Sequence, residues 1–383
     1  MKCFAKKVST GSGKASAASQ KVVPFGKMSS MLEMGIVGMA NVGKSATYNL
    51  LSKQSVPSEN FPFCTIDPNS SIIKVPDSRF EQLCKIYNPA SQICATLQIT
   101  DIAGLVKGAS EGEGLGNEFL SHIKSVDGIY QVVRAFENDK ILHTEGVMDP
   151  VRDLNIIKGE LIAKDIQILD KLVKDNQRKA ERSKNPQQVQ TLQAMQKAMQ
   201  FLQEGQWLRF QQWTNSEVTE LNKIPLLSTK PITFLINQSK KDYESKSCKF
   251  SSGINDWVNE FSSNKSQIID YSVELEQELE GTNSEKITEI ITNGYKLLDL
   301  SHYFTVGKDE VRCWTIRKNS TAPQAASVIH TDFEKGFVSA EVIHFDEFIQ
   351  HPLEKVQKKF RKEGKEYIVQ DGDIIHFKCK ISK

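Results

Sequence analysis

Short apolar runs alternate with stretches of helical periodicity along most of the chain. Buried strands are predicted for five such runs, at residues 34–37, 97–101, 129–134, 231–236 and 267–271. The first run leads through a glycine-containing loop into a helix-like stretch that includes Leu50 and Leu51. Strands that alternate with helices favour an α/β fold, and we expect a mostly parallel central sheet.

A helical period interrupts this alternation in the middle of the chain. Apolar residues share one helix face at Leu154, Ile157, Leu161, Ile168 and Leu172, and a second face at Val189, Leu192, Met195, Met199 and Leu202. The polar segment 175–186 ends in Asn-Pro and predicts a turn between two antiparallel helices. We therefore expect a helical, coiled-coil-like insertion over residues 139–221.

From about residue 300 the apolar positions change towards a period of two. Residues 311–316 alternate, and residues 367–375 predict a tight hairpin around Asp371-Gly372. A small α+β domain is expected over residues 301–383. The main domain is then formed by residues 31–138 and 222–300.

Composition excludes several classes of protein. With 383 residues, 39% apolar and 25% charged, the chain is expected to fold into more than one globular domain. The seven cysteines are scattered and never form CxxC, which predicts free thiols and no zinc site. The net charge of +2 argues against nucleic-acid binding over the whole surface. No apolar run is long enough to cross a membrane.

Residues 1–30 differ from the rest because they contain six lysines and no Asp or Glu. Acid-free, Ser-rich leaders are typical of organelle transit peptides, although this one lacks Arg, and a disordered basic tail is the alternative. If residues 1–30 are a disordered tail, we expect the protein to be cytoplasmic. A transit peptide would direct the protein to the plastid or the mitochondrial matrix instead.

The first loop matches GxxxxGK[ST] in the strand–loop–helix setting of a P-loop nucleoside triphosphatase (NTPase). Its glycines let backbone N–H groups converge on phosphate oxygens beside a helix N-terminus. Lys44 is expected to reach the β- and γ-phosphates, and the Ser45 hydroxyl to bind Mg²⁺. The loop residues predicted to contact nucleotide are Gly38, Asn41, Val42, Gly43, Lys44, Ser45 and Ala46.

A second Mg²⁺ ligand is predicted at Asp101, which opens a DxxG sequence typical of GTPase switch II. Asp101 is expected to hold the metal through water, and the Gly104 N–H to sense the γ-phosphate. Thr65 lies where switch I belongs and is expected to complete the Mg²⁺ site. Lys44, Thr65 and Gly104 are thus the predicted catalytic groups.

Leu105 follows this motif at the position where many GTPases have a Gln that orients the attacking water. Because an aliphatic side chain cannot do this, either another residue orients the water or turnover needs a partner. Asn41 is a candidate to bind K⁺ beside the phosphates. The alternative is a loop Asn that hydrogen-bonds its own backbone.

Base recognition is expected after the strand at 231–236. A guanine-specific protein has NKxD here, whereas this chain has Asn-Gln-Ser-Lys. Lys240 cannot accept hydrogen bonds from guanine, and Asp242 two residues later leaves guanine disfavoured rather than excluded. Asn237 can pair with an adenine edge. The predicted base-binding residues are Asn237, Gln238, Ser272 and Val273.

With these motifs the chain resembles the YchF family of Obg-like ATPases from about Gly35 onward. The resemblance is carried by NFPFCTI at 60–66, DIAGLVKGA at 101–109 with GLGN at 114–117, and APQAA at 322–326 with HTDFEKGF at 330–337. It implies a helical insertion in the nucleotide-binding domain and a C-terminal ubiquitin-like TGS domain. It also implies slow hydrolysis, preference for ATP over GTP, and association with ribosomes.

Three positions depart from the family pattern. Lys240 replaces a common Glu, which bears on the choice between ATP and GTP. Gln131 replaces a His considered for water positioning; it can orient water but cannot act as a general base. The alternative for Gln131 is a polar residue at the edge of a strand. Ala46 replaces a common Thr, which predicts weaker nucleotide binding.

Two basic clusters are candidates for binding ribosomal RNA, and a solvent-exposed charged helix is the alternative for each. One comprises Arg178, Lys179, Arg182 and Lys184, and the other Lys355, Lys358, Lys359, Arg361, Lys362 and Lys365. We expect a monomeric Mg²⁺-dependent ATPase that acts as a nucleotide switch. A nucleotide-gated adaptor with negligible turnover and a GTPase proper are the alternatives.

Overall fold

The computed structural model describes residues 23–27, 29, 31–55, 69–102, 104, 115–138, 140–143, 146–183, 185–262, 267–279 and 284–380. Thr65 and Leu105 lie outside the described residues. None of the described helices has the length and the hydrophobicity that a membrane-spanning helix needs.

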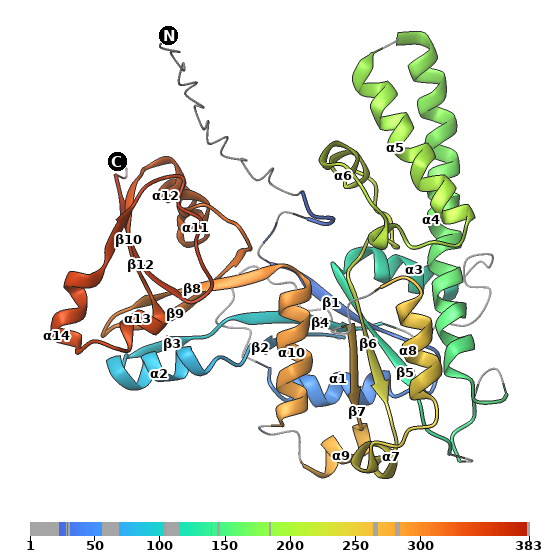
Figure 1. The fold of residues 1–383 in the computed structure, drawn as a ribbon, viewed down its shortest axis with the longest axis horizontal. Coiled ribbons are helices and arrows are strands. Elements are labelled where there is room, and N and C mark those ends of the chain that lie inside the picture. Colours follow the sequence, from blue (N-terminus) through green and yellow to red (C-terminus); the bar gives the residue numbers. More distant parts are fainter. Residues whose placement is uncertain are drawn as a thin grey trace, which may run out of the picture.

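Six of the described strands form a central sheet in the order β2-β4-β1-β5-β6-β7 (Figure 1). All run parallel to their neighbours except β2, which is antiparallel to β4. The strands are β1 (Glu33–Val37), β2 (Ser70–Lys74), β4 (Thr96–Asp101), β5 (Gly128–Arg134), β6 (Ile232–Asn237) and β7 (Ile268–Tyr271). The prediction of an α/β fold with a mostly parallel sheet is confirmed.

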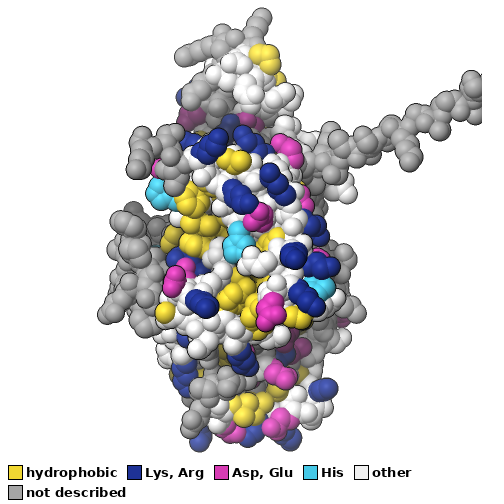
Figure 2. All heavy atoms as spheres, turned by 90° about the vertical axis from the view of Figure 1, so that its left-hand side faces the viewer, with side chains coloured by type: hydrophobic (Ala, Val, Ile, Leu, Met, Phe, Trp, Pro, Cys, Tyr) yellow, Lys and Arg dark blue, Asp and Glu magenta, His cyan; other side chains and the backbone are white. Residues whose placement is uncertain are grey.

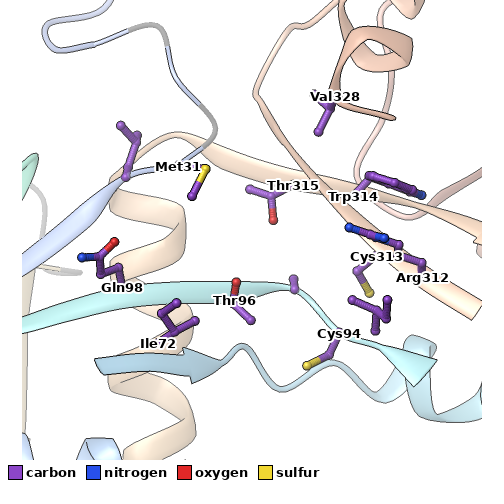
Figure 3. Close-up of a pocket in the computed structure, with 13 residues that line it drawn as sticks. Met31, Ile72, Cys94, Thr96, Gln98, Arg312, Cys313, Trp314, Thr315 and Val328 are labelled. Atoms are coloured by element: carbon purple, nitrogen blue, oxygen red, sulfur yellow. The ribbon is translucent and has the colours of Figure 1, made fainter. Parts of the chain in front are cut away.

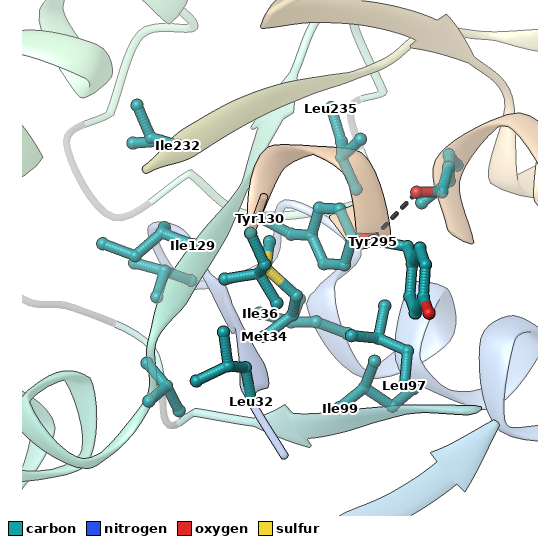
Figure 4. Close-up of a cluster of buried hydrophobic side chains, with 14 of the residues drawn as sticks. Leu32, Met34, Ile36, Leu97, Ile99, Ile129, Tyr130, Ile232, Leu235 and Tyr295 are labelled. Carbon is teal, nitrogen blue, oxygen red and sulfur yellow. Dashed lines mark hydrogen bonds between the residues drawn. The ribbon is translucent and has the colours of Figure 1, made fainter. Parts of the chain in front are cut away.

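Helices cover both faces of this sheet. The described helices around it are α1 (Lys44–Ser52), α3 (Leu115–Ser125), α7 (Lys240–Ser245), α8 (Ser251–Asn259), α9 (Val273–Glu278) and α10 (Glu285–Leu297). The core lies between sheet and helices (Figure 4). There the Tyr130 hydroxyl donates to the Ile290 carbonyl oxygen over 2.8 Å. A Cβ at Gly294 would lie 1.8 Å from that hydroxyl, so only glycine admits the tyrosine.

Two long antiparallel helices form an arm that projects from the sheet domain (Figure 1). They are α4 (Pro150–Ser183) and α5 (Pro186–Gln203), followed by α6 (Asn215–Leu221). The turn between them is much shorter than predicted, because Asn185 caps α5 by accepting a hydrogen bond from the Gln187 N–H. Most residues of the predicted apolar stripes belong to the hydrophobic core or pack against it, including Met195 and Met199, whereas Val189 near the start of α5 is exposed.

Part of the predicted N-terminal tail is folded. The Val23 N–H donates to Asn215 Oδ1 over 2.9 Å. The Asn222 side chain donates to the Pro24 carbonyl oxygen and accepts from the Gly26 N–H, both over 3.0 Å. Because these side-chain amides bond the backbone of Val23, Pro24 and Gly26, the expectation of a disordered tail through residue 30 is wrong for this segment.

A second sheet, at the C-terminal end, has the order β11-β10-β12-β8-β9-β3. Its strands are β3 (Ser91–Ile93), β8 (Leu300–Val306), β9 (Glu310–Arg317), β10 (Phe337–His344), β11 (Arg361–Glu363) and β12 (Asp373–Cys379). The helices with it are α2 (Ser78–Tyr87), α11 (Ala322–Ile329), α12 (Thr331–Lys335), α13 (Phe345–Phe348) and α14 (Leu353–Val356). A C-terminal α+β domain is therefore present.

The predicted hairpin at 367–375 is wrong. Instead, β12 pairs with β10 and β8. The preceding segment is bound to the start of α11, because the Ala322 N–H donates to the Tyr367 carbonyl oxygen and the Val369 N–H to that of Ser320. The Asp371-Gly372 turn therefore leads into β12 from a loop and not from a paired strand.

The connection between β2 and β4 packs with the C-terminal sheet, although we expected residues 31–138 to lie in the nucleotide-binding domain throughout. It contains α2 and also β3, which pairs in parallel with β9. The Arg79 guanidinium contacts Asp77 at 2.7 Å and Asp371 at 2.8 Å. His302 Nε2 lies 2.8 Å from the same Asp77 carboxylate. This ionic network fixes α2 against the C-terminal sheet.

Candidate nucleotide-binding site

The P-loop lies between the carboxyl end of β1 and the N-terminus of α1. Gly43 has φ of 103°, and a Cβ there would lie 2.6 Å from Asn237 Nδ2. A Cβ at Gly38 would lie 2.6 Å from the Val132 carbonyl oxygen. Both positions thus require glycine, because a side chain would collide with neighbouring strands. The loop is held close to the ends of β5 and β6.

Lys44 lies at the centre of the site. Its ammonium donates to the Met39 carbonyl oxygen over 2.7 Å, and the residue is only 8% exposed. Burial lowers the pKa of Lys44, and the nearby Asp101 carboxylate partly offsets this effect. A Cβ at Gly104 would lie 2.9 Å from Lys44 Nζ. The predicted switch II glycine therefore lies directly against the P-loop lysine.

Asp101 and Ser45 fit a Mg²⁺ ion. The Asp101 Oδ1 atom is buried and accepts no hydrogen bond from any described residue. Leaving such an oxygen without a partner is costly, and a hydrated cation would relieve that cost. The Ser45 side chain is exposed in the first turn of α1. Carboxylate and hydroxyl oxygens suit Mg²⁺. Thr65, the third predicted ligand, lies outside the described residues.

Asn237 joins the P-loop to the predicted base-binding loop. Its Nδ2 donates to the Val42 carbonyl oxygen over 3.0 Å, and its Oδ1 accepts from the Val273 N–H over 3.1 Å. The residue is 3% exposed. One amide hydrogen and one oxygen lone pair remain for a base, so pairing with adenine stays a prediction.

Gln238 and the ends of β6 and β7 are also held by protein contacts. Gln238 Nε2 donates to Asp270 over 2.6 Å. The Ser272 hydroxyl accepts from the Leu275 N–H over 3.4 Å and so caps α9. The Val273 N–H is already bonded to Asn237. Base contacts by these residues are therefore limited to the polar groups that remain.

Lys240 forms an ion pair with Glu278, and its N–H lies 3.4 Å from a Glu274 carboxylate oxygen. The hydrogen bond and charge of Glu278 raise the pKa of Lys240. Asp242 accepts a hydrogen bond from the Ser239 hydroxyl over 2.8 Å in the first turn of α7. Both groups that bear on guanine recognition thus have partners within the protein.

Gln131 lies in the middle of β5, between β1 and β6, and is 1% exposed. It is therefore not at an edge. Its Oε1 atom has no hydrogen-bond partner among the described residues. The position faces the same side of the sheet as its register partner Phe234, whose ring packs against Trp257 of α8. A water bound to Gln131 would have to lie inside the protein.

Asn41 has a left-handed backbone with φ of 62°, and its Nδ2 donates to the Leu142 carbonyl oxygen over 3.1 Å. It therefore bonds a different loop and not its own backbone. This hydrogen bond fixes the orientation of the whole side-chain amide, including Oδ1. Binding of K⁺ by Oδ1 stays a prediction. Ala46 is half-buried in the first turn of α1.

Sequence reasoning missed the residues that hold this neighbouring loop. Arg134, the last residue of β5, donates to the carbonyl oxygens of Phe136, Asn138 and Ile141. His143 lies 2.8 Å from Asp153 at the start of α4. Sequence reasoning also missed the Thr47 hydroxyl, which lies 2.6 Å from the Tyr271 hydroxyl and ties α1 to β7. The sequence offered one signal for the loop contacts, which is the arginine at the end of the apolar run 129–134.

This arrangement places the chain in the class of P-loop nucleoside triphosphatases with a GTPase-type fold. It is similar over 374 residues to Obg-like ATPase 1 of Oryza sativa subsp. japonica, with 45% identity and 94% of each chain covered. Obg-like ATPase 1 of Homo sapiens is 44% identical, over 92% of this chain and 94% of the relative. The chain belongs to the YchF family of Obg-like ATPases.

Family models and a solved structure agree with this assignment. Residues 33–171 match the family described as 50S ribosome-binding GTPase, and residues 300–380 match the YchF-GTPase C-terminal family, described as a protein of unknown function. The structure of the Schizosaccharomyces pombe YchF GTPase has a TM-score of 0.82 and 40% identity, covering 94% of this chain and 100% of that chain. The resemblance inferred from the sequence is confirmed.

Proposed function

We propose that the protein is a slow, Mg²⁺-dependent ATPase that uses GTP less well and acts as a ribosome-associated nucleotide switch. The observation that carries the catalytic part is the position of the buried Lys44 between Gly104 and Asp101, whose Oδ1 atom has no hydrogen-bond partner among the described residues. Lys44 would hold the β- and γ-phosphates, and the Gly104 N–H would contact the γ-phosphate. Ser45 and Asp101 would hold Mg²⁺, which neutralises charge on the phosphates when bound.

Preference for ATP rests on the residues around Lys240. Guanine needs an acceptor for its ring N–H and amino group. Lys240 offers none, and the Oδ2 atom of Asp242 is bonded to the Ser239 hydroxyl, so Asp242 has only its remaining acceptor sites for a base. Asn237 retains one donor and one acceptor site, which suffices for an adenine edge. An acid in place of Lys240 would restore the guanine contact.

The test is equilibrium binding of labelled ATP and GTP in Mg²⁺ buffer to the wild type and the K240D variant. The wild type should prefer ATP, and K240D should move the affinity ratio towards GTP by roughly tenfold or more. K241D is the matched control, since Lys241 is the next residue on α7 and is exposed. A wild type that prefers GTP would exclude the ATPase assignment and leave a GTPase proper.

Turnover is measured with the same preparations. Asn41 Oδ1 is the group proposed to bind K⁺ beside the phosphates. Hydrolysis of ATP should therefore be faster in K⁺ than in Na⁺ buffer, and N41A should remove the difference. Equal rates in the two buffers would exclude a role for K⁺. Nucleotide binding without any turnover would favour the adaptor function.

Ribosome association is proposed from the family description and from the basic residues near α14. Lys355, Lys358, Lys359, Arg361, Lys362 and Lys365 are all exposed. They do not form one helix, because α14 ends at Val356 and Arg361 begins β11. Figure 2 shows Lys and Arg side chains on this face, interspersed with acidic and apolar ones. The second cluster contributes Arg178, which is exposed on α4.

Co-sedimentation with ribosomes at two salt concentrations tests this part. The K358E/K359E/K362E variant should bind more weakly than the wild type, with a smaller dependence on salt. The K296E variant is the control, since Lys296 is an exposed residue of α10 and belongs to neither cluster. Equal binding of both variants would remove the C-terminal cluster from the ribosome contact.

A further inference from the structure

A cavity of about 310 Å³ lies between the central sheet and the C-terminal sheet (Figure 3). Its floor is formed by β2 and β4, one side by β9, and the other side by the segment that precedes β1. Apolar walls are contributed by Met31, Ile72, Ile93 and Val328. This volume is typical of sites that bind a small molecule, about 300–1,000 Å³. The cavity is separate from the P-loop.

Arg312 supplies the charge in this cavity. Its guanidinium lies 3.9 Å from the centre of the Trp314 ring, and the ring fixes its plane. In Figure 3 the guanidinium nitrogens of Arg312 lie beside the open space, beneath the indole. The Trp314 N–H is used within the protein, since it donates to Thr305 Oγ1 over 2.8 Å. Stacking therefore positions Arg312 without consuming its N–H donors.

Those donors are available. No hydrogen bond joins the Arg312 guanidinium to any of the described residues, and its one ion pair, from Nη1 to the Glu310 carboxylate, is long at 3.9 Å and partly exposed. The side chain is 31% exposed. Among the described residues that line the cavity, Arg312 is charged and none is acidic. The site therefore favours an anion, because a planar guanidinium presents paired N–H groups to a carboxylate, sulfonate or phosphate.

Apart from its anionic group, the ligand should be a largely apolar, flat ring system that lies against the guanidinium plane, because Arg312 already covers one face of the Trp314 indole. Aliphatic side chains line the cavity together with the polar Thr96, Gln98 and Thr315, and the aliphatic part accepts an aromatic ring system. A metal ion does not fit, since the described residues contain no group of three His, Cys, Asp or Glu able to hold one. We propose that this cavity is an effector site for a small anionic aromatic molecule.

The walls of the cavity also connect it to the nucleotide site. Thr96 and Gln98 line it from β4, the strand that ends at Asp101. Ile72 lines it from β2, which pairs with β4 along its length. Two residues after β3 the chain enters β4, so the C-terminal sheet and the strand that carries Asp101 are joined directly. A ligand that fixes β4 against β9 thus acts on the position of Asp101.

This coupling rests on the proposed nucleotide binding, whereas the cavity itself does not. Coupling between two sites is reciprocal, so a ligand in the cavity should change nucleotide affinity, and nucleotide should change affinity for the ligand by the same factor. Typical coupling factors are about 5–150.

The probe is 8-anilinonaphthalene-1-sulfonate, and its neutral counterpart is N-phenyl-1-naphthylamine, which lacks the sulfonate. Fluorescence titration of the full chain should give saturable binding of the anionic probe and weaker binding of the neutral one. R312Q should weaken the anionic probe about tenfold and leave the neutral one unchanged. V328F, which fills the cavity from α11, should weaken both. R361Q is the control for loss of an exposed arginine.

Thermal melts establish that each variant is folded, and the two variants on opposite walls provide independent tests. If neither R312Q nor V328F changes the affinity for the sulfonate probe, the cavity is not its binding site. Labelled-ATP titration with and without saturating sulfonate probe then measures coupling. An identical ATP affinity overturns the effector role. A wild type that binds the probe but no nucleotide refutes the proposed function and leaves the cavity site standing.

Discussion

The side-chain amide of Asn237 donates a hydrogen bond to the carbonyl oxygen of Val42 over 3.0 Å. The two residues are 195 positions apart in the chain. The same amide accepts from the Val273 N–H, so one buried side chain fixes the P-loop and the start of α9 relative to each other. The P-loop and the predicted base-binding loop are thereby held at a fixed separation.

Replacement of Asn237 by Ala removes both contacts at once. ATP and GTP affinity should fall together, by about 10–100-fold, because two buried hydrogen bonds contribute about 2–3 kcal/mol. Equilibrium titration with both labelled nucleotides measures this. N49A is the control, since Asn49 is exposed on α1. A larger loss for ATP than for GTP would add the proposed adenine contact of Asn237 to this structural role, and unchanged affinity for both nucleotides would exclude the structural role.

Replacement of Asp101 by Asn tests the Mg²⁺ site. The variant keeps the shape of the side chain but loses the negative charge that would attract a hydrated cation. Mg²⁺ affinity of the nucleotide complex should fall about 10–100-fold, the size typical for groups that hold a metal through water. Titrating Mg²⁺ against a fixed concentration of labelled ATP gives this number. D256N, at an exposed residue of α8, should behave as the wild type.

The local parts of this structure follow from the sequence and the long-range parts do not. Gly38, Gly43 and Lys44 form a motif within one loop, where spacing alone determines how the backbone meets phosphate. The contact of Asn237 with Val42 depends on β6 lying beside β5 and β5 beside β1, which no local pattern encodes. The alternative roles of Asn41 were both local, and its actual partner, Leu142, is 101 residues away.

Strand pairing was the least predictable feature for the same reason. Residues 367–375 have the alternation and the Asp-Gly turn of a hairpin, but β12 finds better partners in β8 and β10. Residues 91–93 are too short to be recognised as a strand, and they form β3 only because β9 offers a free edge. The period of apolar residues thus predicts which segments are extended, while the edges available after folding decide the pairs.

The contact between α2 and the C-terminal sheet should depend on Arg79. Burial alone would raise the pKa of Asp77, but hydrogen bonds from His302 and Arg79 hold it well below its usual range. R79A leaves Asp77 with less compensation and should lower the free energy of unfolding by roughly 2–4 kcal/mol. Urea unfolding measures this loss.

The control for R79A is R361A. Arg361 contacts the carboxylates of Glu347 at 4.0 Å and Glu363 at 3.8 Å, and these ion pairs are longer and more exposed. That variant should change stability by less than about 1 kcal/mol. The double variant D77A/R79A should be less destabilised than the sum of the single variants, because the two residues interact directly. Strict additivity would show that the network does not contribute as a unit.

The last prediction concerns Asp165, a carboxylate buried in the middle of α4. It accepts hydrogen bonds from the Leu227 N–H and from the N–H and hydroxyl of Ser228, at 2.6–2.8 Å. Burial raises its pKa from 3.8 to about 6, although these hydrogen bonds oppose the rise. The folded state therefore binds a proton more readily than the unfolded chain between about pH 4 and 6.

This difference in proton binding determines how the free energy of unfolding changes with pH. Ionised Asp165 costs stability above pH 6, and protonation relieves that cost as the pH falls towards 4. The D165N variant does not titrate, and it also loses acceptor capacity, so it should be about 1–3 kcal/mol less stable than the wild type at pH 7. The gap between the two proteins should then widen on acidification, by about 1.4 kcal/mol at pH 5 and by up to about 3 kcal/mol below pH 4. Urea unfolding at pH 7, 6 and 5 measures this difference in stability.

The control is D170N, at an exposed residue of the same helix paired with Lys174. Its stability should differ little from that of the wild type at every pH. A D165N gap that narrows as the pH falls would mean that Asp165 is stabilised as the anion in the folded protein, with its pKa below that of the unfolded chain.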